Sequence, residues 1–355
     1  MGLSGKLIER LRAIIEKISI KDKIAIVHHT DPDGITSGVL AAKLIERLRH
    51  KQADVITNAG GGKAMIDEDT VNSVKGMDYV IITDIAAEQC EETIRKIAEK
   101  SQVIIIDHHK IYGELNEPKI FVIKPQLIGN YTGSDYPASK FVFDIGNLFV
   151  DMNDLDWIAG IGTIGDMCGK YWKEFIENTL KKYELETKEN YMDTLLGKGA
   201  SMISCAESYS HDNIELCFNI IYKAESINDV INSKIADYEK EIQRELDRLI
   251  ELFEKDAIHK DDILFFEMSS KYKVKGPLST ILSVSHPNNT LIIADTSTDP
   301  IRVSARRQDG KVAVNDLLEN AIKGIEGATG GGHKPAAAAA VPKSHYTEFK
   351  KRILC

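Results

Sequence analysis

The stretch IAIVHHTDPDGITSGVLAAKL, residues 24–44, decides the fold of this chain. It begins with an apolar run rich in isoleucine and valine, which is typical of a buried strand, and ends in a segment with the apolar spacing of a helix. The turn between them contains His28, His29, Asp31 and Asp33. An aspartate that caps the helix would explain one of these residues, but not all four. Imidazole nitrogens and carboxylate oxygens together suit Mn²⁺ or Mg²⁺, so the turn is a candidate metal site.

The same alternation of strand and helix continues through the first half of the chain. Strands are predicted at 23–29, 78–84, 102–109 and 119–125, and helices at 35–49, 88–98, 137–150 and 154–163. Nearly continuous Ile/Val strands joined by amphipathic helices indicate a parallel sheet that is covered on both faces. The predicted fold class is therefore α/β, with a doubly wound parallel sheet whose ligands bind at the carboxyl ends of the strands.

The rest of the chain is predicted to form a helical connector and a smaller C-terminal α/β domain. Residues 227–256 have the apolar spacing of one long connecting helix. A coiled-coil dimer seam is the less favoured alternative there, because charges and Tyr238 interrupt the heptads. Beyond it we predict three strands, a helix, a glycine-rich turn and two further segments, at 261–268, 289–295, 300–306, 314–323, 330–332, 336–341 and 344–353. The predicted domains are 1–169, 170–260 and 261–355.

Composition excludes several classes of protein. The formal net charge of −9 argues against a surface coated in basic charge for gripping long duplex DNA. The five cysteines form no CxxC pair and their number is odd, which argues against a disulfide framework or a zinc finger and favours a reducing cytoplasm. The chain shows no signal peptide and no apolar run long enough to span a bilayer, so no membrane association is expected.

Three further acidic or histidine-containing segments follow predicted secondary structure elements. Asp84 ends the strand YVIITD, Asp107, His108 and His109 follow the strand QVIII, and Asp166 lies in IAGIGTIGDMCG. Each has an ordinary explanation. Asp84 could cap the next helix, the two histidines could lie in an exposed loop, and Asp166 could lie in a helix C-terminal turn. Because the strand ends of a parallel sheet face one crevice, however, these residues are expected to converge with those of the opening turn.

So many acids at one place would repel one another strongly in the absence of a cation. Two divalent cations would neutralise them. Two metals about 3.5–4 Å apart bind a bridging hydroxide and polarise a phosphoryl oxygen. The predicted chemistry is hydrolysis of a phosphate ester by that hydroxide.

The four motifs HTDPDGITS, IITD, DHH and GTIGD, in this order, resemble those of the DHH phosphoesterase superfamily. That superfamily includes RecJ-type exonucleases, nanoRNA and cyclic-dinucleotide phosphodiesterases, pAp phosphatases and family II pyrophosphatases. The resemblance implies an enzyme with two divalent metal ions, with Mn²⁺ preferred and Mg²⁺ as the alternative. It also implies a role for each motif residue.

By this resemblance Asp31, helped by His29, binds the first metal, and Asp33, His108 and Asp166 bind the second. Asp84 bridges both metals, and His109 faces the scissile phosphate. The spacing His29-x-Asp31-x-Asp33 resembles the RecJ-like pattern, which favours His29 over His28 as the ligand.

A second resemblance lies near the C-terminus, in ATGGGHKPAAAAAV. It resembles the GGGH signature of the substrate-binding domain that accompanies DHH domains in one subfamily. Three consecutive glycines would let backbone amides approach an anion closely, and a histidine would add a donor; these residues are Gly330, Gly331, Gly332 and His333. In RVSARR, Arg306 resembles the family's substrate arginine, whereas Arg302 and Arg307 are interpreted as surface charges. The active site is expected in the cleft between the two α/β domains.

The implied function is a metal-dependent phosphodiesterase that acts on single-stranded DNA or RNA, as a RecJ-like exonuclease. The spacing of the first motif favours it. The alternative is an enzyme for short substrates such as nanoRNA, cyclic dinucleotides or pAp, which the compact length favours. A third alternative is an inactive replication scaffold, although every ligand position is filled here. The sequence leaves open DNA versus RNA, the cleavage polarity, a homodimer and a replication or repair partner.

Overall fold

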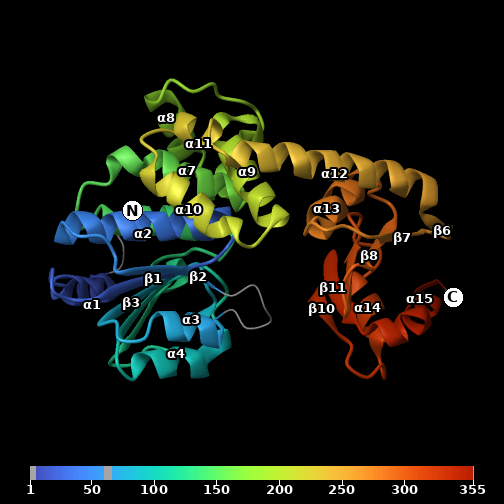
Figure 1. Cartoon of the computed structure of the whole chain (residues 1–355), viewed down its shortest axis with the longest axis horizontal. Coiled ribbons are helices and arrows are strands. Elements are labelled where there is room, and N and C mark those ends of the chain that lie inside the picture. The colour runs from blue at the N-terminus through green and yellow to red at the C-terminus, as the bar shows by residue number, and fades with distance from the viewer. Residues whose placement is uncertain (1–4, 60–65, 355) are drawn as a thin grey trace. The chain divides into compact units, whose positions relative to one another are not determined.

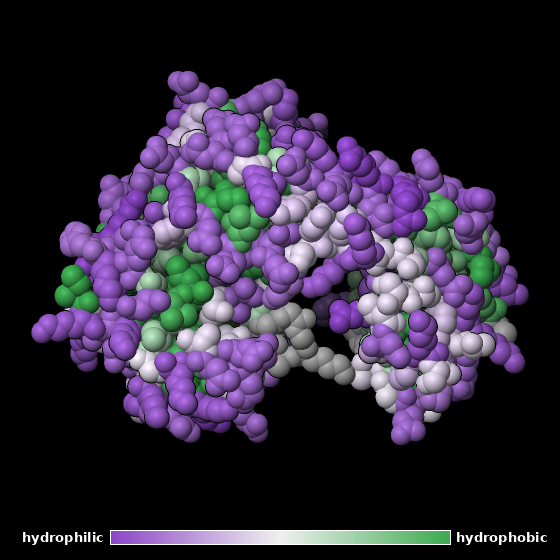
Figure 2. All heavy atoms as spheres, in the orientation of Figure 1, coloured by the Kyte–Doolittle hydropathy of each residue, from purple (hydrophilic) through white to green (hydrophobic). Residues whose placement is uncertain are grey.

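The computed structural model describes residues 5–59 and 66–354. The chain forms two compact units, Met1–Glu239 and Lys240–Cys355, each with its own sheet (Figure 1). On the face shown in Figure 2, hydrophilic side chains predominate and hydrophobic ones form small patches. Within the described ranges, no helix is both long enough and apolar enough to cross a membrane.

The first unit is built on a five-stranded sheet with the order β2-β1-β3-β4-β5, in which every neighbouring pair is parallel. Its strands are β1 (Ile24–His28), β2 (Val55–Asn58), β3 (Tyr79–Thr83), β4 (Gln102–Ile106) and β5 (Ile120–Ile123). The predicted α/β class and its parallel sheet are confirmed. The sequence interpretation omitted β2, a short edge strand with largely accessible side chains, which lacks the apolar run that marks the buried strands.

Helices cover both faces of this sheet (Figure 1). Alternate strand residues point to opposite faces, so each strand contributes to two separate hydrophobic cores. One face packs against α3 (Glu68–Ser73) and α4 (Glu91–Ala98), and the other against a larger helical layer. That layer includes α1 (Gly5–Ile15), α2 (Pro32–Arg49), α6 (Ala138–Gly146) and α7 (Asp156–Gly165).

Four helices of the predicted connector pack into the same larger core. They are α8 (Lys173–Lys182), α9 (Leu195–Tyr209), α10 (Asn213–Lys223) and α11 (Ile227–Ile231). Leu196, Ile203 and Ile221, for example, are fully buried there. The hydrophobic core of the first unit therefore extends well beyond residue 169, and the boundary between the two units falls at 239/240.

The single long helix predicted at 227–256 is wrong, because the chain forms α11 and then α12 (Ile235–Asp256). Two side chains in the break compete for backbone carbonyls: Asn232 donates to the carbonyl of Asn228, and Ser233 donates to that of Val230. Such local bonds offer the backbone an alternative to the helix and interrupt it. Helix α12 runs from the first unit into the second.

The second unit contains a six-stranded mixed sheet with the order β10-β11-β9-β8-β7-β6. Its strands are β6 (Ile258–Lys260), β7 (Ile263–Met268), β8 (Thr290–Asp295), β9 (Ile301–Arg306), β10 (Thr329–His333) and β11 (Ala336–Val341). Its helices after α12 are α13 (Lys275–Ser285), α14 (Val314–Ile322) and α15 (Tyr346–Leu354). The glycine-rich segment, predicted as a turn, is instead the edge strand β10, which pairs antiparallel with the alanine-rich β11.

Candidate metal centre

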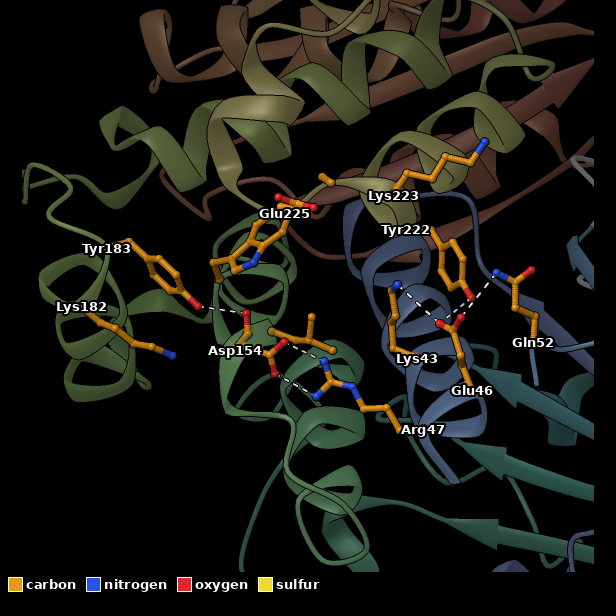
Figure 3. A pocket seen from close by; sticks show the side chains of 13 residues that line it. Lys43, Glu46, Arg47, Gln52, Asp154, Lys182, Tyr183, Tyr222, Lys223 and Glu225 are labelled. Atoms are coloured by element: carbon orange, nitrogen blue, oxygen red, sulfur yellow. Dashed lines mark hydrogen bonds and ion pairs between the residues drawn. The ribbon is translucent and has the colours of Figure 1, made fainter. Parts of the chain in front are cut away.

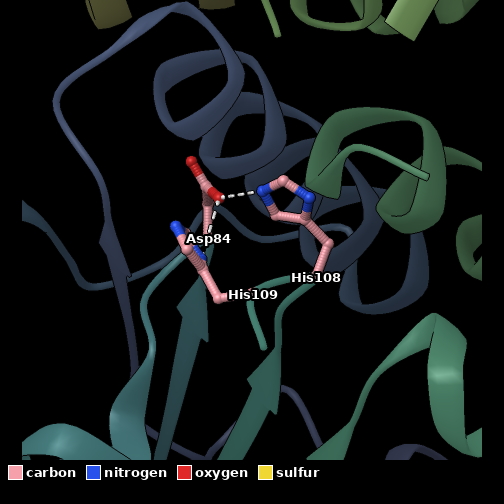
Figure 4. A group of neighbouring side chains, drawn as sticks. All are labelled: Asp84, His108 and His109. Carbon is pink, nitrogen blue, oxygen red and sulfur yellow. Dashed lines mark ion pairs between the residues drawn. The ribbon is translucent and has the colours of Figure 1, made fainter. Parts of the chain in front are cut away.

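The predicted site residues of the first unit come together at the carboxyl edge of its sheet. Their ligand atoms form three overlapping groups, each with all atoms within 4.8 Å of one another. The groups are His29, Asp31 and Asp84; Asp33, His108 and Asp166; and Asp84, His108 and His109. Figure 4 shows Asp84 facing the rings of both histidines that follow β4. The geometry thus brings together all seven residues, while the role of each remains a prediction.

The turn after β1 serves the start of helix α2 and the candidate metal site at once. One oxygen of Asp31 accepts a hydrogen bond from the Gly34 amide at 2.8 Å and so caps α2, whereas its other oxygen lies 3.1 Å from His29 Nδ1. Gly34 is required for this close turn, since an added Cβ would lie 2.4 Å from the His29 Cβ. The ordinary capping explanation and the metal explanation therefore apply to the same carboxylate.

The charges of this turn shift the pKa values of His29 and Asp31. Burial would lower the pKa of His29, but the carboxylates of Asp31 and Asp84 outweigh it and raise the value to about 9. Burial would likewise raise the pKa of Asp31, but the adjacent His29 lowers it to about 2. At neutral pH, without metal, this pair is an imidazolium beside a carboxylate.

Backbone groups hold the second group of ligands. Asp33 is buried, and its two oxygens accept hydrogen bonds from the amides of Ala138 and Ser139, at the start of α6, at 2.7 and 2.9 Å. His108 Nδ1 lies 2.7 Å from the Gly133 carbonyl, which fixes the ring and leaves Nε2 facing Asp84 Oδ1 at 3.2 Å. Atoms bound to one octahedral ion at 2.0–2.1 Å lie about 3 Å apart, so this spacing suits a shared cation.

Asp84 is the most constrained residue of the centre. It is buried, its φ is +60°, and among the described residues its Oδ1 has no partner with hydrogen-bond geometry. Burial, together with the charges of Asp31 and Asp33, raises its pKa well above the usual range. A buried carboxylate oxygen that accepts no hydrogen bond is costly, and so is a left-handed backbone at a non-glycine residue. A bound divalent cation would satisfy this oxygen, and the oxygen and imidazole donors around it fit Mn²⁺ or Mg²⁺.

His109 is held by a buried ion pair that the sequence interpretation did not assign. Its Nδ1 lies 2.7 Å from Asp107 Oδ1, and the other oxygen of Asp107 lies 2.9 Å from the Nζ of the fully buried Lys124. Burial would raise the pKa of Asp107, but His109 and Lys124 hold it below the usual range. Asp107 thereby orients the His109 ring and leaves its Nε2 available. The signal in the sequence was an acid at the end of a buried strand, which needs a partner.

His28 lies outside all three groups. Its ring stacks on Phe218 with centroids 5.0 Å apart, and its Nδ1 lies 2.7 Å from the carbonyl of His29. Burial lowers its pKa to about 4, so the ring is neutral at physiological pH. This packing role agrees with the choice of His29 over His28 as the candidate ligand.

The remaining predicted site residues belong to the second unit. On β9 the Nε of Arg306 donates to Ser279 Oγ at 2.9 Å. The interpretation of Arg307 as a surface charge is wrong, because Arg307 is buried and pairs with Asp262 and Asp309. On β10 the candidate residues are Gly330, Gly331, Gly332 and His333. Gly331 alone among these glycines has open space where a Cβ would point.

A hollow of about 800 Å³ lies in the first unit beside the C-terminal half of α2 (Figure 3). Cations and tyrosines line it, but several of the cations are already paired. Arg47 contacts Asp154 at 2.7 Å, and Lys43 lies 3.5 Å from Glu46. None of the predicted metal-centre residues lines this hollow, so its size does not identify it as the site.

Comparison with known proteins identifies the family. Residues 23–145 match the N-terminal domain of the DHH family, and residues 243–354 match the DHHA1 domain. The chain belongs to the DHH superfamily of phosphoesterases, with a RecJ-like fold.

Two solved structures and one curated relative show how far this likeness extends. RecJ from Thermus thermophilus, in complex with Mn²⁺, matches 99% of this chain with a TM-score of 0.74 and 15% identity, and this chain covers 54% of it. An exonuclease RecJ bound to manganese matches with a TM-score of 0.71 and 15% identity over 100% of this chain and 94% of its own. An uncharacterized protein of Methanocaldococcus jannaschii is 27% identical over 172 residues, which are 45% of this chain and 38% of that protein. The chain thus spans about half the length of the Thermus RecJ, and the matched segment spans less than half of the curated relative.

Asp84→Asn should separate metal binding from folding. Asparagine keeps the size of the side chain and tolerates the positive φ, but it removes the negative charge. We expect loss of Mn²⁺ binding, while the free energy of unfolding of the metal-free protein changes by no more than about 1–2 kcal/mol, because the lost repulsion from Asp31 and Asp33 offsets the lost ion pair with His108. Calorimetric titration with Mn²⁺ and thermal unfolding in a chelator measure the two effects.

Asp261→Asn is the matched control, since Asp261 is exposed and also has a positive φ of 51°. It should change neither quantity. An Asp84→Asn variant that binds Mn²⁺ as the wild type does would place the metal centre elsewhere.

Metal affinity should rise with pH. The pKa of His29 is raised to about 9, and the carboxylate of Asp84, with Asp33 and Asp166, outweighs burial to raise that of His108 to about 11. Both rings therefore carry protons at neutral pH that a metal must displace. We expect Mn²⁺ to bind more tightly at pH about 9 than at about 6, with protons released on binding. Calorimetry in buffers of different ionisation enthalpy counts the protons, and an affinity independent of pH would contradict the assignment.

Proposed function

We propose that this protein is a two-metal-dependent phosphodiesterase that hydrolyses single-stranded nucleic acid as an exonuclease. The observation that carries the proposal is the buried Asp84 carboxylate, whose Oδ1 accepts no hydrogen bond among the described residues and which lies between two groups of imidazoles and carboxylates. The order of a DHH domain and a DHHA1 domain supports it. So does the fold shared with two RecJ structures, both of which contain manganese.

The two groups of ligands would hold one ion each. His29 and Asp31 would bind the first ion, Asp33, His108 and Asp166 would bind the second, and Asp84 lies in reach of both groups. When bound, divalent ions lower the pKa of coordinated water and neutralise charge on phosphoryl oxygens. Mn²⁺ is the favoured ion because imidazole belongs to both sets, and Mg²⁺ would also accept the oxygen donors.

The protein's own contribution to the reaction is orientation and charge. His109 Nδ1 donates to the Asp107 carboxylate, so Nε2 is the nitrogen left for substrate, and in the doubly protonated ring it would donate to a non-bridging phosphate oxygen where negative charge develops. Lys124 and Asp107 are both fully buried, and their ion pair holds this arrangement against rotation. The amides at the start of α6 fix the Asp33 carboxylate in the same way.

The second unit would bind the phosphates of the substrate. The Nε of Arg306 is held by Ser279, which leaves the terminal nitrogens of the guanidinium for a phosphate. Burial lowers the pKa of Lys275 to about 8, against the opposing charge of Asp295 and with help from the charges of Arg302 and Arg306, so these cations share one region. On β10, the open space at Gly331 permits close approach of a phosphate, and the exposed His333 would add a donor.

A phosphodiesterase for short substrates is the second candidate. The net charge of −9 favours it, because affinity for a long single strand depends strongly on neutralising many phosphates. NanoRNA, cyclic dinucleotides and pAp need only a few such contacts. The same metal centre would serve both functions.

Rates on a ladder of substrates would decide between the two candidates. Purified protein with Mn²⁺ would be given DNA and RNA oligonucleotides, from dinucleotides to about thirty nucleotides, together with cyclic dinucleotides and pAp. An exonuclease should degrade the long substrates stepwise, with kcat/KM that does not fall with length. A strong preference for the shortest substrate would reject the exonuclease. No hydrolysis of any of these substrates would reject the enzyme altogether.

Arg306→Ala should weaken substrate binding without affecting the metal centre. Loss of a charge-assisted hydrogen bond to phosphate is worth about 1.5–3 kcal/mol, so KM should rise about tenfold or more while Mn²⁺ affinity stays constant. Steady-state kinetics and Mn²⁺ titration measure the two quantities.

Arg307→Ala is the neighbouring control. It should lower thermal stability, because it leaves Asp262 and Asp309 without their partner, and should change KM less. Equal kinetics for wild type and Arg306→Ala on every substrate would move the phosphate site away from β9.

A further inference from the structure

A groove of about 780 Å³ lies in the first unit, directly after the metal-centre residue Asp166. We call it the Met167 groove. It is formed by the end of α7, the short helical turn Cys168–Lys170 and the segment 188–193. The residues used below are Met167, Lys170, Lys188 and Tyr191. The proposed function assigns no role to any of them.

Met167 has a solvent exposure and a backbone conformation that are both unfavourable for a methionine. The residue is 77% exposed, the largest fraction of any exposed large hydrophobic residue in the described part of the chain. Its φ is +61°, a left-handed conformation that costs an ordinary residue about 1–2 kcal/mol. A glycine would avoid both the strain and the exposure. Strained residues of this kind cluster at sites of function, and Asp84 at the metal centre is a second one.

The residues on either side of Met167 face the metal centre. Asp166 Oδ2 lies 3.8 Å from His108 Nδ1, and Cys168 Sγ lies 3.3 Å from the same Asp166 oxygen. Met167, between them, instead lines the groove. Because Met167 directly follows a candidate metal ligand, the groove begins next to Asp166, and the nucleoside attached to a phosphate at the metal centre is the part of the substrate that would extend toward it.

The remaining walls favour a flat, weakly charged group over a run of phosphates. Lys170 and Lys188 are balanced by Glu189 and Asp193, so the lining carries little net charge. The ring of Tyr191 lies against Gly169, where an added Cβ would be 2.9 Å from the ring, and its hydroxyl bonds Glu177 at 3.3 Å. A tethered aromatic ring and a polarisable thioether are both suited to stacking on a nucleobase.

We propose that the Met167 groove binds the nucleobase adjacent to the scissile phosphate, by stacking of that base against Met167 and Tyr191. The proposal rests on the proposed function and makes Met167 a substrate-positioning residue. Because stacking is tolerant of base identity, the groove would accept every base while requiring that one be present.

The test uses the full-length protein with Mn²⁺ and single-stranded oligonucleotides about ten nucleotides long. One substrate carries all its bases, and the others carry a single abasic residue at the first or second position from either end. Wild-type KM should rise about fivefold or more for one abasic position, since a stacked base contributes about 1–3 kcal/mol. Met167→Gly should raise KM for the full substrate about two- to tenfold, reduce the abasic penalty and affect kcat less. Met167→Leu should restore most of the discrimination.

Glu184→Gly is the matched control, because Glu184 is exposed, has a φ of +54° and lies outside the groove. Both glycine variants should unfold at or above the wild-type temperature, which shows that any change in KM is not a loss of fold. An abasic penalty that is absent in the wild type, or unchanged in Met167→Gly, would overturn the inference while leaving the phosphodiesterase intact. A wild type that hydrolyses no substrate would overturn the proposed function, and the inference with it.

Discussion

The repulsion among buried carboxylates at one edge of the sheet is the constraint on which the first unit depends. Asp33 and Asp84 are buried within a few ångströms of the same imidazole, and Asp31 and Asp166 adjoin them. Without metal, two helix N-termini and two protonated imidazoles offset this repulsion. The elements that surround the centre are therefore arranged to hold negative charge in place, which is the first requirement of a site for divalent cations.

Much of the fold could be predicted because its signals are local and repeated. The buried strands are continuous apolar runs, and the parallel sheet follows from their alternation with helices. The errors lie where tertiary contacts override local pattern. The apolar spacing of 227–256 is continuous, but polar side chains at Asn232 and Ser233 divide it. The glycines of β10 have low strand propensity, yet they pair because the small alanines of β11 lie opposite.

The same contrast between local sequence pattern and tertiary contact applies to the candidate site. Residue types and strand ends were sufficient to select Asp31, Asp84 and His108, because topology alone directs them to one edge. The partner of Asp107 could not be predicted, since Lys124 follows the next strand and only folding brings it near. Met167 carried no signal at all, because a methionine after an aspartate is unremarkable until its backbone conformation and exposure are known.

The left-handed backbone at Asp84 also bears on how such a protein changes over evolutionary time. Only glycine, asparagine and aspartate adopt that conformation with ease. Asparagine and glycine are each one base substitution away from an aspartate codon. A single nucleotide change would therefore remove the Asp84 carboxylate while keeping a residue that suits the backbone, so a descendant could keep the fold and lose the proposed metal centre. Architecture alone is then a poor guide to whether a relative keeps the proposed metal centre, and the residue at this one position is a better one.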